Sequence, residues 1–445
     1  MTDILDWTGA DLERLNIESS ASKAETVARR LIQETGNGDL PFLTMPYLNE
    51  LKTQLGDLRG RLQSYDHMLL LGIGGSALGA RALQKAFFPQ QDMPGHEGPW
   101  LWIADNVDPS TLDGYLDRLP PEKTVVVTVS KSGGTIETVG QYFIVRDWMR
   151  TVLGDRWKEN MLFVTGESGF LRDESEAHGI TTLPVPENLG GRYSVLSAVG
   201  MIPALFLGLD VDALLEGARE VAAPLTDPEL DAVTLGKHES FRLACWGKSL
   251  MDAGFAELIF FAYIPLWADF GDWFAQLWAE SLGKNGKGSQ PIPAVGVTDQ
   301  HSVNQMFLDG PRNKACLFLT CPELPDGPRF PDELPAKFDY VQGKPFGELI
   351  RAEGLGTMMA LQKNGVPLVE IRMEQDAPRQ AGKMIALLGA ATILTGWLMD
   401  INPLDQPAVE LGKRLAKARL GADGLEPEKK DLDAFLSAGR EIREF

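Results

Sequence analysis

The stretch TVVVTVSKSGGTIET, residues 124–138, decides the fold that we expect. It opens with a run of apolar and β-branched residues, 124–129, which is typical of a strand buried on both faces of a sheet. The glycines at 133 and 134 then favour a turn, and the following residues favour a helix. A strand that leads through a glycine turn into a helix is the unit from which parallel α/β sheets are built.

Hydroxyl side chains crowd the turn of this unit. Four of them flank Lys131 and the glycine pair: Ser130, Ser132, Thr135 and Thr138. Hydroxyls and turn amides can bind several oxygens of one phosphate without a metal ion, and the dipole of the following helix adds about 0.3–1 kcal/mol for a nearby anion. The alternative is ordinary capping, because serine and threonine are preferred at helix starts. Four hydroxyls beside a Gly-Gly pair favour an anion site.

Alternating strand and helix patterns continue along the chain. We expect strands at 68–73, 101–104, 124–129 and 161–165 in a first series, and at 258–263, 294–297, 316–320 and 368–371 in a second. Helices are expected within 10–66 and around 380–398, 409–419 and 428–443. This alternation predicts parallel sheets sandwiched between helices, so the fold class is α/β. The proline-rich segment 322–346 is expected to be an extended loop.

Composition limits the function classes. The 445 residues carry a formal net charge of −20, so the surface repels a nucleic-acid backbone, and an anionic ligand must meet a local positive pocket. The three cysteines form no CxxC pair and the five histidines have no metal-ligand spacing, which argues against a zinc site or a disulfide framework.

Targeting and membrane signals are not expected in this sequence. The N-terminus has no basic segment followed by an apolar one, so it does not resemble a signal peptide. Two apolar runs, 193–209 and 384–399, are interrupted by proline or glycine and are expected to be buried core helices. We therefore expect a cytoplasmic protein.

Residues 72–79, GIGGSALG, form a second strand-to-helix junction. Glycines there permit close approach to the backbone, and free amides at a helix start attract anions. Gly72, Gly74 and Ala77 satisfy a loose dinucleotide-binding pattern. The acidic residue that such a site needs about 20 positions further on is missing, because Asp105 lies well beyond that distance. A nucleotide site is therefore the weaker alternative.

Two charged residues lie next to apolar sequence. Arg192 follows a Gly-Gly pair in NLGGRYS, residues 188–194, and is either a solvated surface charge or a cation that points inward. Glu280 in WAESLGKNGKG, residues 278–288, follows the apolar stretch WFAQLWA. It is either a surface residue beside aromatic rings or a base, because a carboxylate withdrawn from water becomes more basic.

The last candidates are isolated polar residues. His301 in DQHS is a lone histidine, for which a structural role is the commoner one. The stretch NPLDQPAVELGK, residues 402–413, sets Gln406 and Lys413 two helical turns apart, so both can face one side of a helix. The alternative is a solvated helix start with Pro407 near its first position.

Together these stretches resemble the glucose-6-phosphate isomerases, also called phosphoglucose isomerases. Six motifs stand in the family's order between about residues 65 and 415: GIGGSALG, SKSGGTIET, GGRYS, QLWAESLGK, QHS and NPLDQPAVELGK. Each motif is weak alone, whereas the ordered set is specific. Leu404 and Ala408 depart from the family's usual Phe and Gly, and neither change removes a reactive group. The length resembles that of the shorter bacterial members.

The resemblance implies two sugar-isomerase subdomains, each a parallel sheet between helices, with the site between them. We expect an N-terminal helical segment over 1–60, a first subdomain over 61–220, a second over 221–400, and C-terminal helices over 401–445 that pack back on the site. The implied reaction is the reversible conversion of D-glucose 6-phosphate to D-fructose 6-phosphate through a cis-enediol, in glycolysis and gluconeogenesis. The family uses neither a metal nor an organic cofactor for it.

The resemblance also implies roles for single residues. Glu280 matches the base that moves a proton between C2 and C1, Arg192 the residue beside the developing enediolate, and His301 and Lys413 the ring-opening positions. Substrate contacts are implied for Gly74, Ser76, Ser130, Lys131, Ser132, Thr135, Thr138, Gln276 and Gln406. In the family the histidine comes from the neighbouring subunit, so a homodimer is implied.

Three alternatives stay open. A sugar-phosphate sensor would need the loop at 130–138, but not a base and a ring opener. Another sugar-phosphate isomerase, acting on mannose 6-phosphate or an amino sugar, would differ in the shape of its pocket. A nicotinamide-linked dehydrogenase would use residues 72–77.

Overall fold

The stretch 124–138 folds as predicted in the computed structural model, which describes residues 2–439 and 441–443. It forms strand β4 (Thr124–Ser130), a turn and the start of helix α8 (Ile136–Leu153). Every residue of β4 is buried, as expected for a central strand of a parallel sheet covered on both faces. The chain divides into two units, Met1–Pro403 and Leu404–Phe445.

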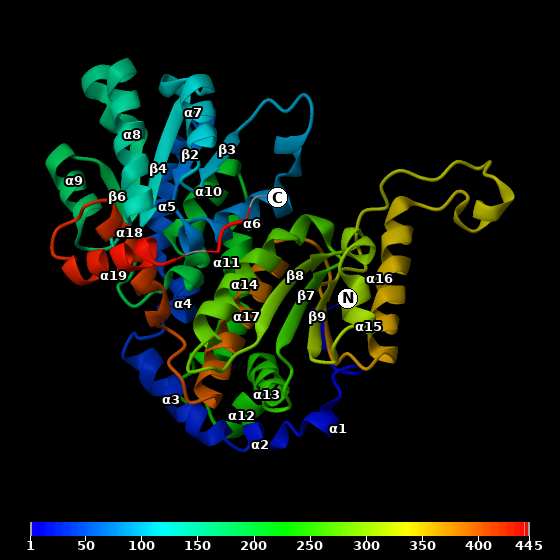
Figure 1. Ribbon diagram of the computed structural model, residues 1–445. Coiled ribbons are helices and arrows are strands. Elements are labelled where there is room, and N and C mark those ends of the chain that lie inside the picture. Colours follow the sequence, from blue (N-terminus) through cyan, green and yellow to red (C-terminus); the bar gives the residue numbers. More distant parts are fainter. Residues whose placement is uncertain (1, 440, 444–445) are drawn as a thin grey trace. The chain divides into compact units, whose positions relative to one another are not determined.

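Strand β4 is the central strand of the first sheet, which is entirely parallel and has the order β3-β2-β4-β5-β6 (Figure 1). Its other strands are β2 (His67–Leu71), β3 (Trp100–Ala104), β5 (Met161–Thr165) and β6 (Thr181–Pro184). The chain runs from β2 to β3 and then returns to the other side of β2 to form β4. Ligands of open α/β sheets bind at the carboxyl ends of strands where the order reverses in this way. The loops after β2 and β4 are therefore neighbours at such a point.

The second sheet has the order β1-β10-β9-β7-β8. Its parallel strands are β7 (Glu257–Ala262), β8 (Gln290–Val295), β9 (Lys314–Thr320) and β10 (Leu368–Arg372). Strand β7 lies between β8 and β9 just as β2 lies between β3 and β4, so the two sheets share one strand arrangement. The predicted α/β fold with parallel sheets flanked by helices is confirmed.

Helices connect the strands of the first unit. Besides α8 they are α1 (Leu12–Leu15), α2 (Glu18–Ala21), α3 (Ala24–Gly36), α4 (Pro41–Thr44), α5 (Asn49–Leu62), α6 (Leu78–Phe87), α7 (Pro109–Arg118), α9 (Phe170–His178), α10 (Ala198–Leu207), α11 (Val211–Ala222), α12 (Ala232–Gly236), α13 (Glu239–Asp252), α14 (Asp269–Leu282), α15 (Asn304–Asp309), α16 (Phe346–Lys363) and α17 (Pro378–Leu398).

Helix α17 is a core helix, as its apolar sequence predicted. It is long and apolar enough to cross a membrane, yet 94% of its apolar window is buried inside the protein, and it packs against α11, α13 and α14. Glycines permit its close approach to α11. A Cβ on Gly382 would lie 1.9 Å from the carbonyl oxygen of Leu214, and one on Gly217 would lie 1.9 Å from that of Arg379.

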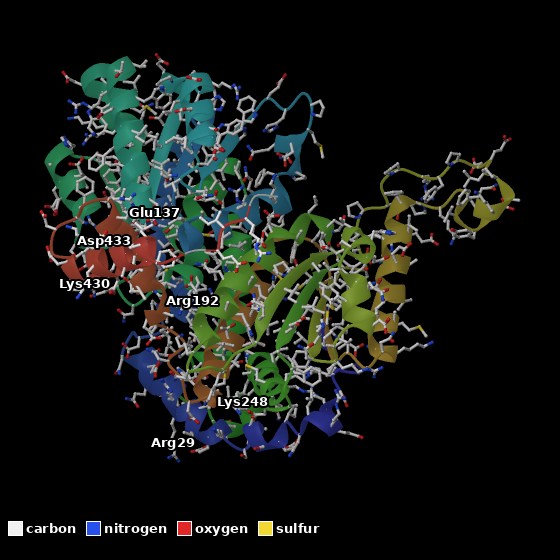
Figure 2. The ribbon with its side chains drawn as sticks, in the orientation of Figure 1. Arg29, Glu137, Arg192, Lys248, Lys430 and Asp433 are labelled. Atoms are coloured by element: carbon white, nitrogen blue, oxygen red, sulfur yellow. The ribbon has the colours of Figure 1, made fainter. Side chains whose placement is uncertain are left out.

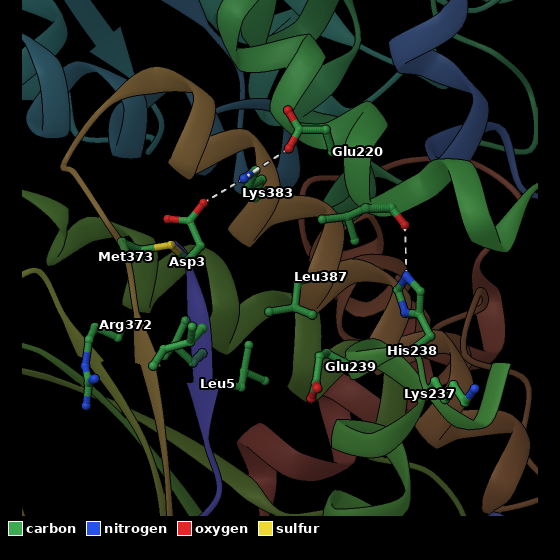
Figure 3. Close-up of a pocket in the computed structure, with 13 residues that line it drawn as sticks. Asp3, Leu5, Glu220, Lys237, His238, Glu239, Arg372, Met373, Lys383 and Leu387 are labelled. Atoms are coloured by element: carbon green, nitrogen blue, oxygen red, sulfur yellow. Dashed lines mark hydrogen bonds and ion pairs between the residues drawn. The ribbon is translucent and has the colours of Figure 1, made fainter. Parts of the chain in front are cut away.

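Strand β1 (Ile4–Asp6) was not predicted, and it completes the second sheet by pairing antiparallel with β10. The Asp3 carboxylate just before it accepts a hydrogen bond of 2.7 Å from Lys383 Nζ of α17, and the same nitrogen lies 3.0 Å from Glu220 of α11 (Figure 3). Burial opposes ionisation of Asp3, but the hydrogen bonds from Lys383 and from the amide of Glu374 outweigh it and lower the pKa of Asp3. The N-terminal strand is thus tied to two helices of the core.

Other departures from the sequence prediction involve short or unpatterned elements. Edge strand β6 and helix α16 were not predicted. The segment before α16 is irregular apart from a short 3-10 turn at Ala336–Val341, and Figure 1 shows it projecting away from α16. This agrees with the extended loop expected at 322–346.

The second unit consists of a 3-10 turn (Pro407–Val409) and helices α18 (Glu410–Arg419) and α19 (Glu426–Ser437). An ion pair between Arg414 and Glu428 joins the two helices. Helix α19 ends earlier than the predicted residue 443, because Ala438 is extended. Residue 440 of the predicted helix lies outside the described residues.

Candidate active site

The hydroxyls after β4 converge as the anion-site interpretation requires. Ser130 Oγ lies 3.0 Å from Thr135 Oγ1 and 3.5 Å from Ser132 Oγ, and the latter two atoms are 3.3 Å apart. Thr135 starts α8, yet its side chain caps no amide of that helix. The capping alternative is therefore wrong for Thr135, and the three hydroxyls form a cluster at the helix start.

The backbone of this loop forms hydrogen bonds with the segment that follows β5. The carbonyl of Lys131 accepts a hydrogen bond from the amide of Gly166, and that of Gly133 accepts one from Leu171. Gly133 has a φ of +63°, which glycine adopts without strain. A Cβ on Gly169 would lie 2.5 Å from the carbonyl oxygen of Ser132, so the two loops touch through bare backbone. These contacts fix the hydroxyl cluster in place.

Two further residues of the loop differ in their surroundings. Lys131 is exposed overall, but part of its side chain is withdrawn from water, and this partial burial lowers the pKa of its ammonium group. The positive charge of nearby Arg192 lowers this pKa further, whereas the negative charge of Glu187 raises it. The positive charges of Lys131 and Arg192 therefore act on the same region. Thr138 is buried, and its hydroxyl has no hydrogen-bond partner among the described residues.

The two glycine motifs at 72–79 and 188–194 pack against each other through bare backbone. A Cβ on Gly75 would lie 2.2 Å from the carbonyl carbon of Gly191 and 2.6 Å from the amide nitrogen of Arg192. Only glycine allows this contact, which sets Arg192 beside the loop after β2. Gly74 has a φ of +57°, and a Cβ there would lie 3.0 Å from Gln276 Nε2. The segment Gly74–Ser76 forms a 3-10 turn shortly after β2.

Arg192 points inward and is almost completely buried. Its Nε donates to Ser281 Oγ at 2.8 Å, its Nη2 to the carbonyl of Pro403 at 2.8 Å, and its Nη1 to Glu280 Oε2 at 3.0 Å. Figure 2 shows Arg192 among the inner side chains, whereas Arg29 projects from the surface. The alternative of a solvated surface charge is wrong.

Glu280 lies on the last turns of α14, with 32% of its side chain exposed. Its Oε2 accepts from Arg192, and its Oε1 accepts from Gln276 Nε2, one helical turn earlier, at 3.0 Å. Lys284 caps the end of this helix by donating to the carbonyls of Glu280 and Ser281. Both carboxylate oxygens are thus oriented by hydrogen bonds while the group still reaches solvent.

This arrangement can carry out acid–base chemistry on an anionic ligand. A carboxylate with ordered neighbours can accept and return a proton, and a guanidinium beside it can hold negative charge. The hydroxyl cluster can bind a phosphate at the same edge of the first sheet. Sequence reasoning missed Ser281 and the carbonyl of Pro403, although Ser281 directly follows Glu280.

His301 is not part of this group of contacts. It is exposed and follows β8, where it lines a cavity of about 670 Å³ with residues that follow β7 and β9. None of the predicted substrate-binding residues lines that cavity. The ring-opening role of His301 stays a prediction.

Gln406 and Lys413 belong to the second unit, and both are exposed. Lys413 Nζ donates to Glu410 at 2.8 Å, and this hydrogen bond lowers the pKa of Glu410. Gln406 precedes the 3-10 turn that Pro407 begins, so helical spacing does not relate it to Lys413. Their roles stay predictions. In the part of the chain that the structure describes, no three His, Cys, Asp or Glu side chains group as metal ligands.

Comparison with known sequences gives consistent matches. A sequence profile described as phosphoglucose isomerase matches residues 48–321 and 354–434. The chain is 39% identical to a glucose-6-phosphate isomerase of Rubrobacter xylanophilus over 80% of this chain and 82% of that one. It is 32% identical to the enzyme of that name from Carboxydothermus hydrogenoformans over 95% and 93%. The gap in the profile match contains the extended segment before α16.

Solved structures give a similar picture. A hypothetical protein from Thermus thermophilus superposes with a TM-score of 0.84 at 30% identity, covering 95% of this chain and all of that one. A glucose-6-phosphate isomerase from Chlamydia trachomatis superposes with a TM-score of 0.78 at 21% identity, covering 97% and 91%, which supports the fold.

Proposed function

The chain belongs to the phosphoglucose isomerase family of aldose–ketose isomerases, and we propose that it interconverts D-glucose 6-phosphate and D-fructose 6-phosphate. One observation carries the proposal: Glu280 contacts Arg192 at 3.0 Å, so a base lies beside a permanent cation. The hydroxyl cluster of Ser130, Ser132 and Thr135 supports a phosphate-bearing substrate.

Proton transfer in this proposal needs the open-chain sugar. The C2 proton moves to Glu280 and leaves a cis-enediolate with its negative charge on O1. A proton then moves from O2 to O1, and Glu280 returns its proton to C1, which gives the ketose. Arg192 stays protonated at any working pH, so it stabilises negative charge on these oxygens without acting as the acid. Gln276 orients the carboxylate through its 3.0 Å hydrogen bond.

Ring opening is assigned to His301 and Lys413. An imidazole gains and loses a proton near neutral pH, so it can exchange protons with the ring oxygen and the anomeric hydroxyl. We propose that His301 is supplied by the neighbouring subunit of a homodimer and that Lys413 assists. The support for both residues is the family resemblance of their motifs.

Substrate orientation is assigned to the loops after β2 and β4. Ser130, Lys131, Ser132, Thr135 and Thr138 would bind the phosphate. Gly74, Ser76, Gln276 and Gln406 would contact the sugar. The phosphate lies away from the reacting carbons, so its binding energy fixes the orientation of the sugar.

The family resemblance is the support for a proposed cellular setting. We propose a cytoplasmic homodimer that acts in glycolysis and gluconeogenesis. Its subdomains would extend over 61–220 and 221–400, with a helical segment before them and the helices over 401–445 contributing to the site.

A coupled assay tests the function. Fructose 6-phosphate should give glucose 6-phosphate, detected by an added dehydrogenase, and the rate should be unchanged by excess chelator. Mannose 6-phosphate and glucosamine 6-phosphate, offered in parallel, should react far more slowly. Binding of fructose 6-phosphate without turnover would instead indicate a sensor, and faster turnover of another sugar would replace the proposed substrate.

A further inference from the structure

Gln300 directly precedes His301 in the 3-10 turn Thr298–His301. The histidine is exposed and lines the cavity of about 670 Å³, whereas the glutamine is half-buried and is not among the residues that line it. The two neighbouring side chains therefore have different surroundings. A glutamine that holds the turn from the interior leaves the imidazole free to meet a ligand.

The amide nitrogen of Gln300 has three acceptors within hydrogen-bond distance. It lies 2.5 Å from the hydroxyl oxygen of Tyr263, which follows β7, and 2.7 Å from Thr357 Oγ1 on α16. The carbonyl of Glu353, one turn earlier on α16, is a longer contact at 3.3 Å. Tyr263 in turn donates to Thr357 Oγ1 at 2.9 Å. Three side chains from three segments thus form a triangle of hydrogen bonds.

Tyr263 is a rigid partner in this triangle, because close contacts enclose its ring. The ring is stacked on that of Phe318 in β9, with the two centroids 4.8 Å apart. A Cβ on Gly296 would lie 2.4 Å from the Tyr263 ring, and one on Gly354 would lie 2.9 Å from it. Burial raises the pKa of the phenol, so its hydroxyl stays neutral and can both donate and accept. The triangle is therefore attached to the core of the second sheet.

Asp299 holds the same turn from the other side. Its Oδ2 accepts from the amide of Val295, the last residue of β8, at 2.8 Å. Its Oδ1 accepts from Ser302 Oγ at 2.6 Å. The two residues before His301 are thus hydrogen-bonded to three different elements, which restricts the backbone that carries the imidazole.

We propose that Gln300 is a positioning residue that holds His301 in the orientation needed for ring opening. Tyr263 and Thr357 support it. The inference rests on the proposed function, in which the imidazole exchanges protons with the ring oxygen and the anomeric hydroxyl. A misplacement of about 1 Å can cost about 10²-fold in rate. Proton transfer between C2 and C1 is assigned to Glu280 on another element, so the triangle should affect ring opening alone.

A pair of substrates separates ring opening from proton transfer. Fructose 6-phosphate closes its ring through the hydroxyl at C5, since the hydroxyl at C6 is esterified. 5-Deoxyfructose 6-phosphate lacks that hydroxyl and stays an open chain, so it needs proton transfer but no ring opening. Incorporation of deuterium from D₂O at C1, followed by NMR, reports proton transfer for both substrates.

Gln300→Met removes all three contacts and keeps an unbranched side chain of similar length. We expect exchange into fructose 6-phosphate to slow about 10- to 100-fold, and exchange into the 5-deoxy substrate to change less than about threefold. Thr357→Val keeps the shape of a buried side chain and removes one acceptor, so it should show the same selectivity with a smaller loss. Selective loss on the cyclic substrate indicates that the triangle serves ring opening.

A double variant shows whether Gln300 acts through His301. Exchange into fructose 6-phosphate by Gln300→Met with His301→Ala should match that of His301→Ala within about twofold, because the positioned imidazole is already absent. Losses that multiply overturn the proposal. Gln54→Met is the matched control, because it removes an exposed hydrogen bond to Glu50 within α5, and it should leave both exchange rates unchanged.

The wild-type rates distinguish a failure of this inference from a failure of the proposed function. A wild-type protein that exchanged neither substrate would overturn both. An active wild type whose Gln300→Met variant is equally impaired on the two substrates would overturn the inference alone. If Gln300→Met does not fold, equal losses on the two substrates in Thr357→Val overturn it.

Discussion

Glu280 differs from an ordinary surface carboxylate in what each of its oxygens contacts. One accepts from a buried cation and the other from a neutral amide one turn earlier on the same helix. Gln276 provides the amide from within α14, whereas Arg192 provides the cation from the distant turn Gly191–Leu196. The side chain is still partly exposed, so a substrate can reach it.

Replacing Glu280 by Gln tests the base. Glutamine keeps the size and one hydrogen-bonding oxygen but cannot take a proton from carbon, so kcat should fall about 10²- to 10⁴-fold. Binding of inorganic phosphate, measured by calorimetry, should stay close to that of the wild type. Glu257→Gln is the matched control, because it alters a partly exposed carboxylate that pairs with Lys314 away from the site. A near-normal kcat for Glu280→Gln would remove this residue from the role.

Replacing Ser130 and Thr135 together by Ala tests the phosphate loop. Hydrogen bonds to a charged group contribute about 1.5–3 kcal/mol each, so affinity for fructose 6-phosphate and for inorganic phosphate should both fall at least about tenfold. Thr151→Ala, at the exposed far end of α8, should change neither affinity. If the wild-type protein bound glucose as tightly as its 6-phosphate, no phosphate site would be needed.

The residue-level prediction for the phosphate loop rests on chemistry that is local in the sequence. The density of hydroxyls at 130–138 is a property of consecutive residues, and the convergence of Ser130, Ser132 and Thr135 agrees with it. Ser281 could not be assigned, because its partners are two side chains that only the fold brings to α14. Their spacing along the chain carries no signal for that contact.

At the scale of elements, the sequence predicted strands whose interiors are continuously apolar and missed the short edge strands β1 and β6. Strand β4 is a continuous buried run, so its pattern identified it. Strand β1 is only Ile4–Asp6, and its partner β10 lies at the other end of the first unit. Three residues are too few for a periodic pattern, so pairing and the Asp3–Lys383 contact define this strand.

Asp3→Asn tests whether the ionised carboxylate next to β1 stabilises the fold. The lowered pKa of Asp3 means that its ionised form stabilises the fold; this stabilisation is complete above the ordinary value of 3.8 and is lost as pH falls through the lowered folded-state value. At pH 7 the variant should lose about 1–3 kcal/mol of unfolding free energy in urea titrations.

The pH dependence is the discriminating part of this experiment. Near pH 3 the wild type and Asp3→Asn should differ by less than half of their difference at pH 7. Asp113→Asn changes an exposed aspartate of α7 and should show little difference at either pH. An Asp3→Asn difference that is equal at both pH values would mean that the charge of Asp3 does not fasten the strand.

At the scale of the whole molecule, an acidic protein has to bind an acidic substrate. The net charge of −20 repels a sugar phosphate at long range, so attraction must come from local cations. Lys131 and Arg192 come from different segments of the chain, and they lie close enough for the charge of Arg192 to lower the pKa of Lys131, which belongs to the loop of the hydroxyl cluster. Composition alone predicted the need for such a local field, and the contact between the two glycine turns explains how Arg192 comes to lie beside the loop after β2.

Mixing two inactive variants tests whether His301 crosses a subunit boundary. In a symmetric dimer of Glu280→Gln with His301→Ala, one of the two sites regains both residues. Equal mixing with full subunit exchange should therefore restore about a quarter of wild-type activity, since half of the dimers are mixed. The control mixes Glu280→Gln with Arg192→Ala, which damage the same subunit's site, and should restore none. Failure of the first pair to recover activity after verified exchange would place His301 outside the neighbour's site.

The hydrogen bond from Arg192 to the carbonyl of Pro403 has a consequence for interpreting variants. That carbonyl belongs to the last residue of the first unit, and a main-chain oxygen is present whatever side chain stands at 403. A substitution of Arg192 removes the donor of this hydrogen bond, whereas a change of side chain at 403 leaves the acceptor in place. An Arg192→Ala variant would therefore lose a main-chain contact at the end of the first unit as well as a positive charge, so a loss of activity in it would combine two structural effects.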